Sequence, residues 1–274
     1  MNVAVVGVGL IGGSIGAGLL ESGFAESVCG IDIDPENLEI ARNRKLVTYT
    51  QSDFSGLTNI DLWVVATPPS AVGAVLEQIA LVAEPETAIT DCASVKQSIV
   101  HEVPASIKPL FVGGHPMGGT QHQGAEHASS TMFADRPWIL TPNGCTEPRA
   151  FQRVQKMVFA LDAVPTEMSP EEHDRHMAVL SHVPNILSST LAVLGGSLER
   201  TDIAGGSWTD LTRLAGSAPE LWADIISHNS SEIVSALTML IERLDELREA
   251  VKGGDQAAVQ RAFESARVIK DSQN

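Results

Sequence analysis

A glycine-rich loop near the start of the chain constrains the fold more than any other feature. Residues 7–12 read Gly-Val-Gly-Leu-Ile-Gly, after a β-branched run at residues 3–6 that is typical of a buried parallel strand. A helical pattern follows the loop, and a second apolar run at residues 27–31 leads to Asp32. A strand, this loop, a helix and an acid about twenty residues further on predict a Rossmann-type dinucleotide-binding unit.

The loop residues predict how a dinucleotide would be held. Gly7 allows a tight turn, Gly9 lets the backbone approach the pyrophosphate, and Gly12 lets the helix pack closely on the strand. The helix that begins near Leu10 and Ile11 would point its free N–H groups and the positive end of its dipole at the phosphates. We therefore expect these five residues to bind the cofactor.

Asp32 predicts which dinucleotide binds. A carboxylate at this position accepts hydrogen bonds from a ribose 2′-hydroxyl and repels a 2′-phosphate. No arginine follows at once, since the next residues are Ile33, Asp34 and Pro35. We therefore expect NAD rather than NADP.

The overall charge and the cysteines exclude several classes of partner. The chain has 18 Lys and Arg against 34 Asp and Glu, a formal net charge of -16. Such a surface repels nucleic acid and anionic lipid, so we expect neither as a partner. The apolar run at residues 3–20 has no basic residue before it and contains six glycines, so we expect neither a signal peptide nor a membrane span. The three cysteines form no CxxC pair, which is typical of a cytoplasmic protein with reduced thiols.

Strand and helix patterns alternate over the first 166 residues. Strands are expected at residues 60–66, 87–90, 110–112 and 138–141, and helices at 38–44, 71–82 and 149–161. This alternation predicts an α/β fold with a doubly wound, mostly parallel sheet. Ligands of such sheets bind beyond the carboxyl ends of the strands. Thr67 with Pro68, the turn at residues 91–96, and His115 each follow a strand, so we expect them to converge near the nicotinamide.

Strand signals nearly disappear after about residue 166. Helices are expected at residues 171–198, as one long stretch or two with a kink at Pro184, and at 210–214, 221–251 and 256–269. We therefore predict a dinucleotide-binding domain at residues 1–166 and an all-α domain for substrate binding and dimerisation at residues 167–274. Small helical domains with long apolar stripes often bury them against a second copy, so we expect a homodimer.

Three polar residues are candidates for chemistry. His115 lies beside the expected nicotinamide, Ser94 lies in the neighbouring turn, and Arg213 is a cation that could clamp a carboxylate. Three histidines share a helical stretch at residues 173–182, but there is no His-Glu-x-x-His motif and no convincing carboxylate partner. We therefore expect no metal.

Six short motifs occur in order along nearly the whole chain. They are residues 7–14 (GVGLIGGS), 91–96 (DCASVK), 113–120 (GGHPMGGT), 173–174 (HD), 181–184 (SHVP) and 210–213 (DLTR). The glycine loop is common to many families, whereas the Ser-Val-Lys, His-Pro-Met and Ser-His-x-Pro elements in this order are much more specific. On these motifs the chain resembles the prephenate/arogenate dehydrogenases of tyrosine biosynthesis.

The resemblance implies a small-molecule substrate and roles for five residues. The substrate is a cyclohexadienol with a ring carboxylate and a 4-hydroxyl group. His115 would take the hydroxyl proton as hydride leaves for NAD, and Ser94 would hydrogen-bond both groups. Loss of CO2 then restores aromaticity. Arg213 would bind a substrate carboxylate, and His182 and Trp222 would line the substrate pocket.

Two positions depart from the pattern of some relatives. Asn185 follows the Ser-His-x-Pro element where some prephenate-using relatives have His, and Gln121 follows Thr120 where some have Glu. We place Thr120, Gln121 and Asn185 with the substrate-binding residues. Gln121 removes one partner for the ammonium group of arogenate, whereas the missing histidine argues the other way. We favour conversion of prephenate to 4-hydroxyphenylpyruvate, with arogenate, or both substrates, as the alternative.

Two other functions fit a dinucleotide-binding domain. β-Hydroxyacid and imine-reducing dehydrogenases typically need a catalytic lysine on the first helix of their second domain, and no lysine occurs between Lys156 and Lys252. A non-catalytic NAD sensor would bind NAD without turnover. Ser94, His115 and Arg213 together argue against a sensor.

Overall fold

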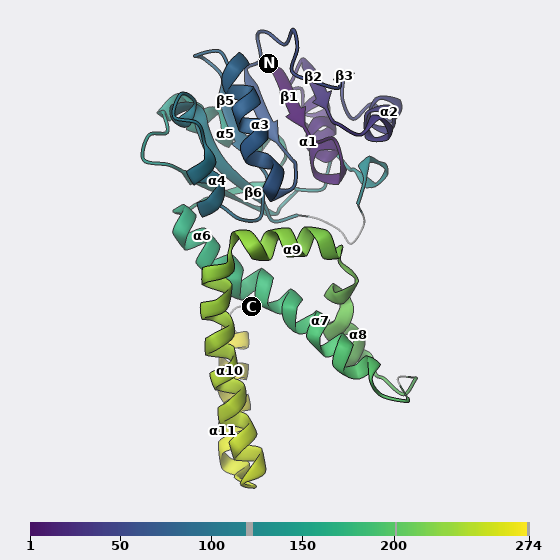
Figure 1. Cartoon of the computed structure of the whole chain (residues 1–274), viewed down its shortest axis with the longest axis vertical. Helices are drawn as coiled ribbons and strands as arrows, with labels where there is room; N and C mark the ends of the chain where they lie inside the picture. Colours follow the sequence, from purple (N-terminus) through teal and green to yellow (C-terminus); the bar gives the residue numbers. More distant parts are fainter. Residues whose placement is uncertain (119–122, 201, 273–274) are drawn as a thin grey trace. The chain divides into compact units, whose positions relative to one another are not determined.

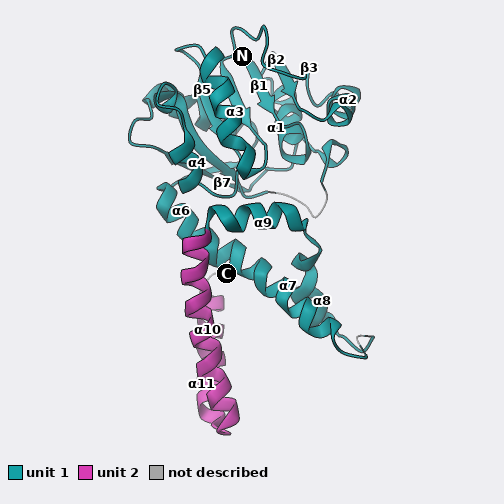
Figure 2. Ribbon diagram, in the orientation of Figure 1, with its two compact units in different colours: residues 1–229 teal, residues 230–274 magenta. Residues whose placement is uncertain are grey.

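The computed structural model describes residues 1–118, 123–200 and 202–272 of the chain. Its fold divides into two compact units, Met1–Asn229 and Ser230–Asn274 (Figure 2). The first unit holds a sheet and the helices around the candidate site, and the second unit is a pair of helices. The predicted domain boundary after residue 166 lies within the first unit and stays a prediction.

An eight-stranded sheet forms the centre of the first unit (Figure 1). Its strands are β1 (Asn2–Val6), β2 (Ser27–Ile31), β3 (Tyr49–Gln51), β4 (Leu62–Val65), β5 (Ala88–Asp91), β6 (Phe111–Pro116), β7 (Pro137–Pro142) and β8 (Val164–Glu167). They lie in the order β3-β2-β1-β4-β5-β6-β7-β8, and every neighbouring pair is parallel except β6 and β7. The doubly wound, mostly parallel α/β sheet predicted from the sequence is confirmed.

The central strands β1, β4 and β5 are buried on both faces of the sheet, which explains why β1 and β4 are apolar throughout instead of alternating. In β1, Val3 and Val5 join one hydrophobic cluster, whereas Ala4 and Val6 join the other. Residues of α1 (Leu10–Glu21) and α5 (Pro148–Ala160) belong to the first cluster, and residues of α3 (Pro69–Val82) and α4 (Gln97–Glu102) to the second. Each buried aliphatic side chain contributes about 1.5–3 kcal/mol, so the sheet is a rigid frame for the loops at its edge.

The strand order reverses between β1 and β4. From β1 the chain runs outward through β2 and β3, and α2 (Pro35–Asn43) lies between those two strands in the sequence. It then returns to β4 on the other side of β1. Open α/β sheets bind ligands at this kind of switch point, beyond the carboxyl ends of the strands. Because β1, β4, β5 and β6 are mutually parallel, the residues at their carboxyl ends share one edge.

The rest of the first unit is helical, as predicted. It consists of α6 (Pro170–Met177), a π-helical turn (Ala178–His182), α7 (Val183–Gly196), α8 (Gly206–Thr212), a 3-10 turn (Arg213–Gly216) and α9 (Pro219–His228). The helical stretch 170–196 is continuous, and Pro184 lies directly after its π-helical turn. Prolines and π-helical turns are both places where helices bend, and the predicted kink at Pro184 stays a prediction.

The prediction of one helix over residues 221–251 is wrong. The chain forms α9 and then α10 (Ser230–Lys252), and Asn229 between them leaves the helical conformation, with φ −128° and ψ 30°. The Asn229 side chain is buried, and its Nδ2 donates to the carbonyl oxygen of Asp174 at 2.9 Å. This tertiary hydrogen bond stabilises a break that the apolar periodicity of the sequence does not reveal.

The second unit consists of α10 and α11 (Gln256–Asp271), which pack on each other. Gly254 in the turn between them has φ +67°, a conformation that favours glycine. Several large apolar side chains of the two helices are exposed, among them Val234, Met239, Ile241, Phe263 and Val268. A surface with this many exposed apolar side chains is typical of an interaction site.

Among the described residues, one helical stretch, Pro170–Gly196, has the length and apolar composition of a membrane span. Length and composition alone are weak evidence, because a core helix passes the same test. This stretch contains His173, Asp174, His182 and Asn185, all of which are buried and make polar contacts within the first unit. Such contacts are those of a helix that packs on protein.

Candidate active site

The glycine loop has the geometry of a dinucleotide-binding turn. Gly7 has φ +88°, and a Cβ atom there would lie 2.6 Å from the carbonyl oxygen of Ala66. A Cβ at Gly12 would lie 1.8 Å from the carbonyl oxygen of Gly7, so only glycine lets α1 start this close to β1. A Cβ at Gly9 would meet no atom within 4 Å, which leaves open space where a pyrophosphate would approach.

The start of α1 suits an anion. Gly9 is the N-cap residue, no side chain caps the helix, and its first turn contains no acid. The first N–H groups of the helix, at Leu10 and Ile11, are therefore available for a phosphate. Both residues are half-buried, as expected for residues at the edge of a ligand site.

Asp32 lies directly after β2 and faces the glycine loop. Its Oδ2 accepts from the N–H of Val8 at 2.9 Å, and its Oδ1 accepts from the N–H of Asp34 at 2.9 Å. The carboxylate therefore holds the loop in place and lies beside it. A carboxylate has about four lone-pair sites, so Asp32 keeps capacity for a ribose hydroxyl.

Thr67 and Pro68 follow β4, which lies next to β1 in the sheet. The Cγ2 atom of Thr67 lies 3.2 Å from the position of a Cβ at Gly7, so the two strand ends meet. The Thr67 hydroxyl is buried and has no hydrogen-bond partner within the described parts of the chain. A buried hydroxyl without a partner is costly, and a bound cofactor would supply one. Gly7, Gly9, Gly12, Asp32 and Thr67 thus fit a dinucleotide.

His115 lies near the carboxyl end of β6 and is buried. Its Nδ1 lies 2.8 Å from Nε2 of His173 on α6, and Nδ1 of His173 lies 2.7 Å from Oδ1 of Asp174. His173 and Asp174 are also fully buried. A continuous hydrogen-bonded chain therefore joins the strand-end histidine to a carboxylate on a helix, 59 residues later in the sequence.

The Asp174 carboxylate also holds the start of α4. Its Oδ1 accepts from the N–H of Lys96 at 2.7 Å, and its Oδ2 accepts from the N–H of Gln97 at 2.9 Å. Ser94 lies in the same turn, but its hydroxyl makes no hydrogen bond to His115 in this structure. The contact between Ser94 and His115 that the family resemblance implies therefore stays a prediction.

A buried ion pair lies in this turn as well. Nζ of Lys96 and Oδ2 of Asp91 pair with both side chains fully buried. Asp91 also accepts from the N–H groups of Ala93 at 2.9 Å and Gly114 at 3.0 Å, which ties β5 to β6 beside His115. Breaking such a pair leaves an unpaired buried charge and typically costs about 3–5 kcal/mol.

The histidines of the site are neutral at pH 7. Burial lowers the pKa of His115 well below its ordinary value of 6.5, and the nearby His173, Lys96 and His182 lower it further. Burial likewise lowers the pKa of His182 to about 4, against the opposing charge of Asp174. A neutral imidazole keeps one lone pair, which can accept a proton.

His182 lies at the end of the π-helical turn, with its ring edge-on to Trp222 of α9 and ring centres 6.1 Å apart. Its Nδ1 lies 3.2 Å from Nδ2 of Asn229, which is a donor, so the ring proton belongs on Nε2. That Nε2 is buried and has no well-aligned partner among the residues the structure describes, although the backbone of Ser94 lies near enough to raise the pKa of His182. His182 can therefore donate to an acceptor on a ligand.

Arg213 begins the 3-10 turn after α8 and is exposed. It makes no ion pair with any carboxylate in the described parts of the chain, so its charge is available. Nδ2 of the buried Asn185 on α7 lies 3.4 Å from Oγ of Ser217, which ties α7 to the segment that carries Arg213. Thr120 and Gln121 lie outside the described residues.

The three histidines at residues 173–182 do not converge on one point. His173 bonds His115 and Asp174, whereas His176 is exposed and contacts the carbonyl oxygen of Glu172. Within the described ranges, no group of three His, Cys, Asp or Glu side chains has metal-binding geometry.

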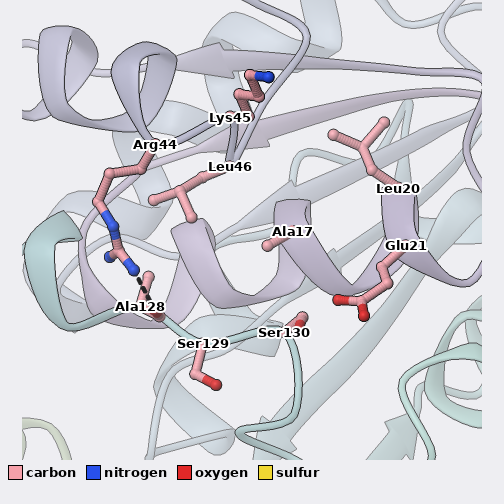
Figure 3. A pocket seen from close by; sticks show the side chains of 9 residues that line it. All are labelled: Ala17, Leu20, Glu21, Arg44, Lys45, Leu46, Ala128, Ser129 and Ser130. Atoms are coloured by element: carbon pink, nitrogen blue, oxygen red, sulfur yellow. Dashed lines mark hydrogen bonds between the residues drawn. The ribbon is translucent and has the colours of Figure 1, made fainter.

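Two surface pockets of the first unit are large enough to hold a small ligand. One, of about 560 Å³, lies along the carboxyl-terminal half of α1 and is lined by Ala17, Leu20, Glu21, Arg44, Lys45, Leu46, Ala128, Ser129 and Ser130 (Figure 3). Its lining includes none of the residues at the phosphate-binding start of that helix. The other, of about 400 Å³, is lined by Pro68, Ser70, Gln123, Ala218, Glu220, Leu221 and Asp224 and adjoins the predicted cofactor residue Pro68.

Two matches to family models cover most of the chain. The prephenate dehydrogenase nucleotide-binding domain matches residues 15–166, and the prephenate dehydrogenase dimerization domain matches residues 169–265. The glycine loop precedes the first matched span, so its assignment depends on the geometry described above.

Individual relatives are similar over nearly the full chain. Prephenate dehydrogenase of Bacillus subtilis (strain 168) is 32% identical over 279 residues, which cover 98% of this chain and 75% of that protein. A structure of prephenate dehydrogenase from A. aeolicus with hydroxyphenyl propionate and NAD+ has a TM-score of 0.92 at 26% identity and covers 100% of this chain and 98% of its own. Synechocystis arogenate dehydrogenase has a TM-score of 0.86 at 27% identity, with 100% of both chains covered. This chain therefore belongs to the prephenate dehydrogenase family and is an NAD-dependent dehydrogenase.

Proposed function

We propose that this enzyme oxidatively decarboxylates prephenate to 4-hydroxyphenylpyruvate, with arogenate as the alternative substrate. The observation that carries the proposal is the position of His115. It is a buried, neutral histidine at the sheet edge where the glycine loop and Thr67 also lie. The relatives named above include both a prephenate and an arogenate dehydrogenase.

In this proposal His115 is the general base. NAD, held by the glycine loop, Asp32, Thr67 and Pro68, supplies a hydride acceptor. His115 takes the proton of the substrate 4-hydroxyl as the carbon–hydrogen bond at that carbon breaks, and the carbonyl forms. Loss of CO2 from the ring carboxylate then gives a phenolate, to which His115 returns the proton. Ser94 would align the hydroxyl with the histidine. The reaction releases no net proton from the site.

The substrate anions would be held by the helical part of the first unit. Arg213 has no carboxylate partner within the described residues and would bind a carboxylate of the substrate. His182 would donate a hydrogen bond from Nε2 to the substrate, and Trp222 beside it would pack against the substrate ring. Asn185, Thr120 and Gln121 complete the proposed set. Gln121 offers no carboxylate to the ammonium group of arogenate, so we favour prephenate, although Asn185 in place of a histidine argues the other way.

The family match and the exposed apolar surfaces support a proposed assembly. We propose a soluble, cytoplasmic homodimer with a dinucleotide-binding domain at residues 1–166 and a helical domain at residues 167–274. A dimerization-domain match over residues 169–265 and the exposed apolar side chains of α10 and α11 support the homodimer.

The test is NADH formation from prephenate and from arogenate, each with NAD and with NADP. We expect turnover of prephenate with NAD. Higher kcat/KM for arogenate would make the alternative correct, and binding of NAD without turnover of either compound would overturn the enzymatic proposal.

A further inference from the structure

The hydrogen-bonded chain from His115 through His173 to Asp174 has a determined direction. Both oxygens of Asp174 accept backbone N–H groups, at Lys96 and Gln97, as an ionised carboxylate does. The contact of Oδ1 with Nδ1 of His173 therefore requires a proton on that nitrogen. Because burial lowers the pKa of His173 and the ring is neutral at pH 7, its Nε2 carries a lone pair.

The same argument then fixes His115. Nε2 of His173 is an acceptor, so Nδ1 of His115, 2.8 Å away, must carry the proton. A neutral His115 with its proton on Nδ1 has its lone pair on Nε2, the nitrogen on the far side of the ring. Other partners are excluded for Nδ1, because it makes no second hydrogen bond with any described residue.

We propose that His173 and Asp174 are positioning residues, which hold His115 in the tautomer whose Nε2 lone pair takes the proton of the substrate hydroxyl. This inference rests on the proposed role of His115 as the base. With the opposite tautomer, Nε2 would carry a hydrogen and would be unable to accept the hydroxyl proton. The pair also orients the ring, since an acceptor at a fixed place defines where Nδ1–H points.

The surrounding charged and titratable groups influence the free energy needed to protonate His115. The cation of Lys96 and the rings of His173 and His182 oppose an imidazolium at His115. Lys96 is itself paired with Asp91, and Asp174 favours a charged ring at His173. As His115 takes the proton, its Nδ1–H contact with His173 lets Asp174 stabilise the transient cation. The proton returns to the product phenolate, so none has to travel along the chain.

His173 is the residue to change, because Asp174 also holds the start of α4 and its loss would disturb the fold. His173→Gln can keep a side-chain oxygen that accepts from His115, whereas His173→Leu removes the acceptor. His176→Leu is the matched control, because His176 lies one helical turn away on α6 and is exposed.

Kinetics supply the first readout. We expect His173→Leu to lower kcat about 10- to 100-fold, the usual effect of losing an orienting partner, with KM for NAD and substrate changed by less than about twofold. His173→Gln should recover most of kcat, and the control should keep wild-type values. Equal losses in His173→Gln and His173→Leu, or a loss confined to KM, would indicate a structural role and overturn the proposal.

The 15N chemical shifts of the His115 ring supply a readout that needs no turnover. In enzyme labelled at its eight histidines, with His115→Asn used for assignment, we expect the Nδ1–H tautomer in the wild type and in His173→Gln. His173→Leu should shift the ring toward the Nε2–H tautomer. A wild-type His115 protonated on Nε2 would refute the inference even if the enzyme turns over. The expected shifts without turnover of either substrate would refute the proposed function and leave the tautomer assignment standing. If His173→Leu does not fold, the wild-type tautomer and the His173→Gln kinetics still decide.

Discussion

Asp224 of α9 accepts two hydrogen bonds from Ser70 at the start of α3, although the two residues are 154 positions apart. The backbone N–H of Ser70 donates to Oδ2 at 3.0 Å, and its hydroxyl donates to the same oxygen at 2.9 Å. A carboxylate at a helix start satisfies a free N–H group and interacts favourably with the helix dipole. Asp174 does the same at the start of α4. Asp224 of α9 and Asp174 of α6 thus stabilise the starts of α3 and α4, which each follow a strand of the sheet.

This relationship predicts a stability effect. Replacing Asp224 by Ala should lower the free energy of unfolding by about 1–2 kcal/mol, as loss of a helix cap does. Ser70→Ala removes one of the two hydrogen bonds and should cost less, about 1 kcal/mol. Urea denaturation of both single variants and the double variant is the measurement. Since the residues are partners, the double variant should lose less than the sum, and strict additivity would contradict the contact.

Replacing His115 by Asn should remove the base without disturbing the cofactor. We expect kcat to fall about 10²- to 10⁴-fold, the usual contribution of general base catalysis, while the Kd for NAD stays within about twofold. Stopped-flow measurement of NADH formation gives kcat, and titration of NAD binding gives the Kd. A variant with near-normal kcat would exclude His115 as the base.

Replacing Arg213 by Ala should weaken substrate binding. A hydrogen bond to a charged group contributes about 1.5–3 kcal/mol, so KM for the substrate should rise about 10- to 100-fold. Arg243→Ala is the control, because Arg243 is also exposed but pairs with Glu246 on α10. If the Arg213 variant changes only NAD affinity, the assignment of Arg213 to the substrate is wrong.

Asp32 should determine cofactor choice. Asp32→Asn removes the charge that repels a 2′-phosphate, and we expect the ratio of kcat/KM for NADP over NAD to rise by about tenfold or more. Asp34→Asn is the control, since Asp34 is exposed and caps α2 through the N–H of Glu36. A wild-type enzyme that prefers NADP would contradict the role given to Asp32.

The buried His182 should make stability fall in mild acid. Its pKa is about 4 in the folded protein and near 6.5 when exposed in the unfolded chain. Above pH 6.5 both states hold it neutral. As pH falls from 6.5 toward 4, the unfolded state binds a proton that the folded state does not, so the free energy of unfolding decreases.

Thermal unfolding between pH 7 and pH 4.5 tests this expectation. The Tm of the wild type should fall with pH more steeply than that of His182→Gln, which has no ring to protonate. His101→Gln, at an exposed histidine, is the control and should keep the wild-type slope. Equal slopes for wild type and His182→Gln would show that His182 does not contribute.

The sequence predicted well where a local pattern has a local cause. Gly7 and Gly12 are required by steric contacts within a few residues and across one strand, and the apolar runs of β1 and β4 follow from burial on both faces. Shorter elements left no such signal. The strands β3 and β8 have three and four residues and are mostly exposed or half-buried. Their hydrophobic pattern is therefore too short to predict a strand.

The motif residues His173 and Asp174 were recognised from the sequence, but their task was not. Nothing local distinguishes a histidine that bonds another histidine from one on a helix surface, and His176, one turn later, is such a surface residue. Asn229 is similar, since a single asparagine in an amphipathic pattern gives no sign that it will end a helix. Both roles depend on partners more than 45 residues away.

The amino-acid sequence by itself determined the dinucleotide-binding unit and the family, and it identified His115 and Arg213 as candidate site residues, because each depends on a short motif whose chemistry is local. Only the tertiary structure decided which nitrogen of His115 carries the proton, which carboxylates hold α3 and α4, and where the long helix breaks. These features depend on hydrogen bonds between groups that meet only after the chain has folded, and directional contacts of that kind leave no periodic trace in the sequence.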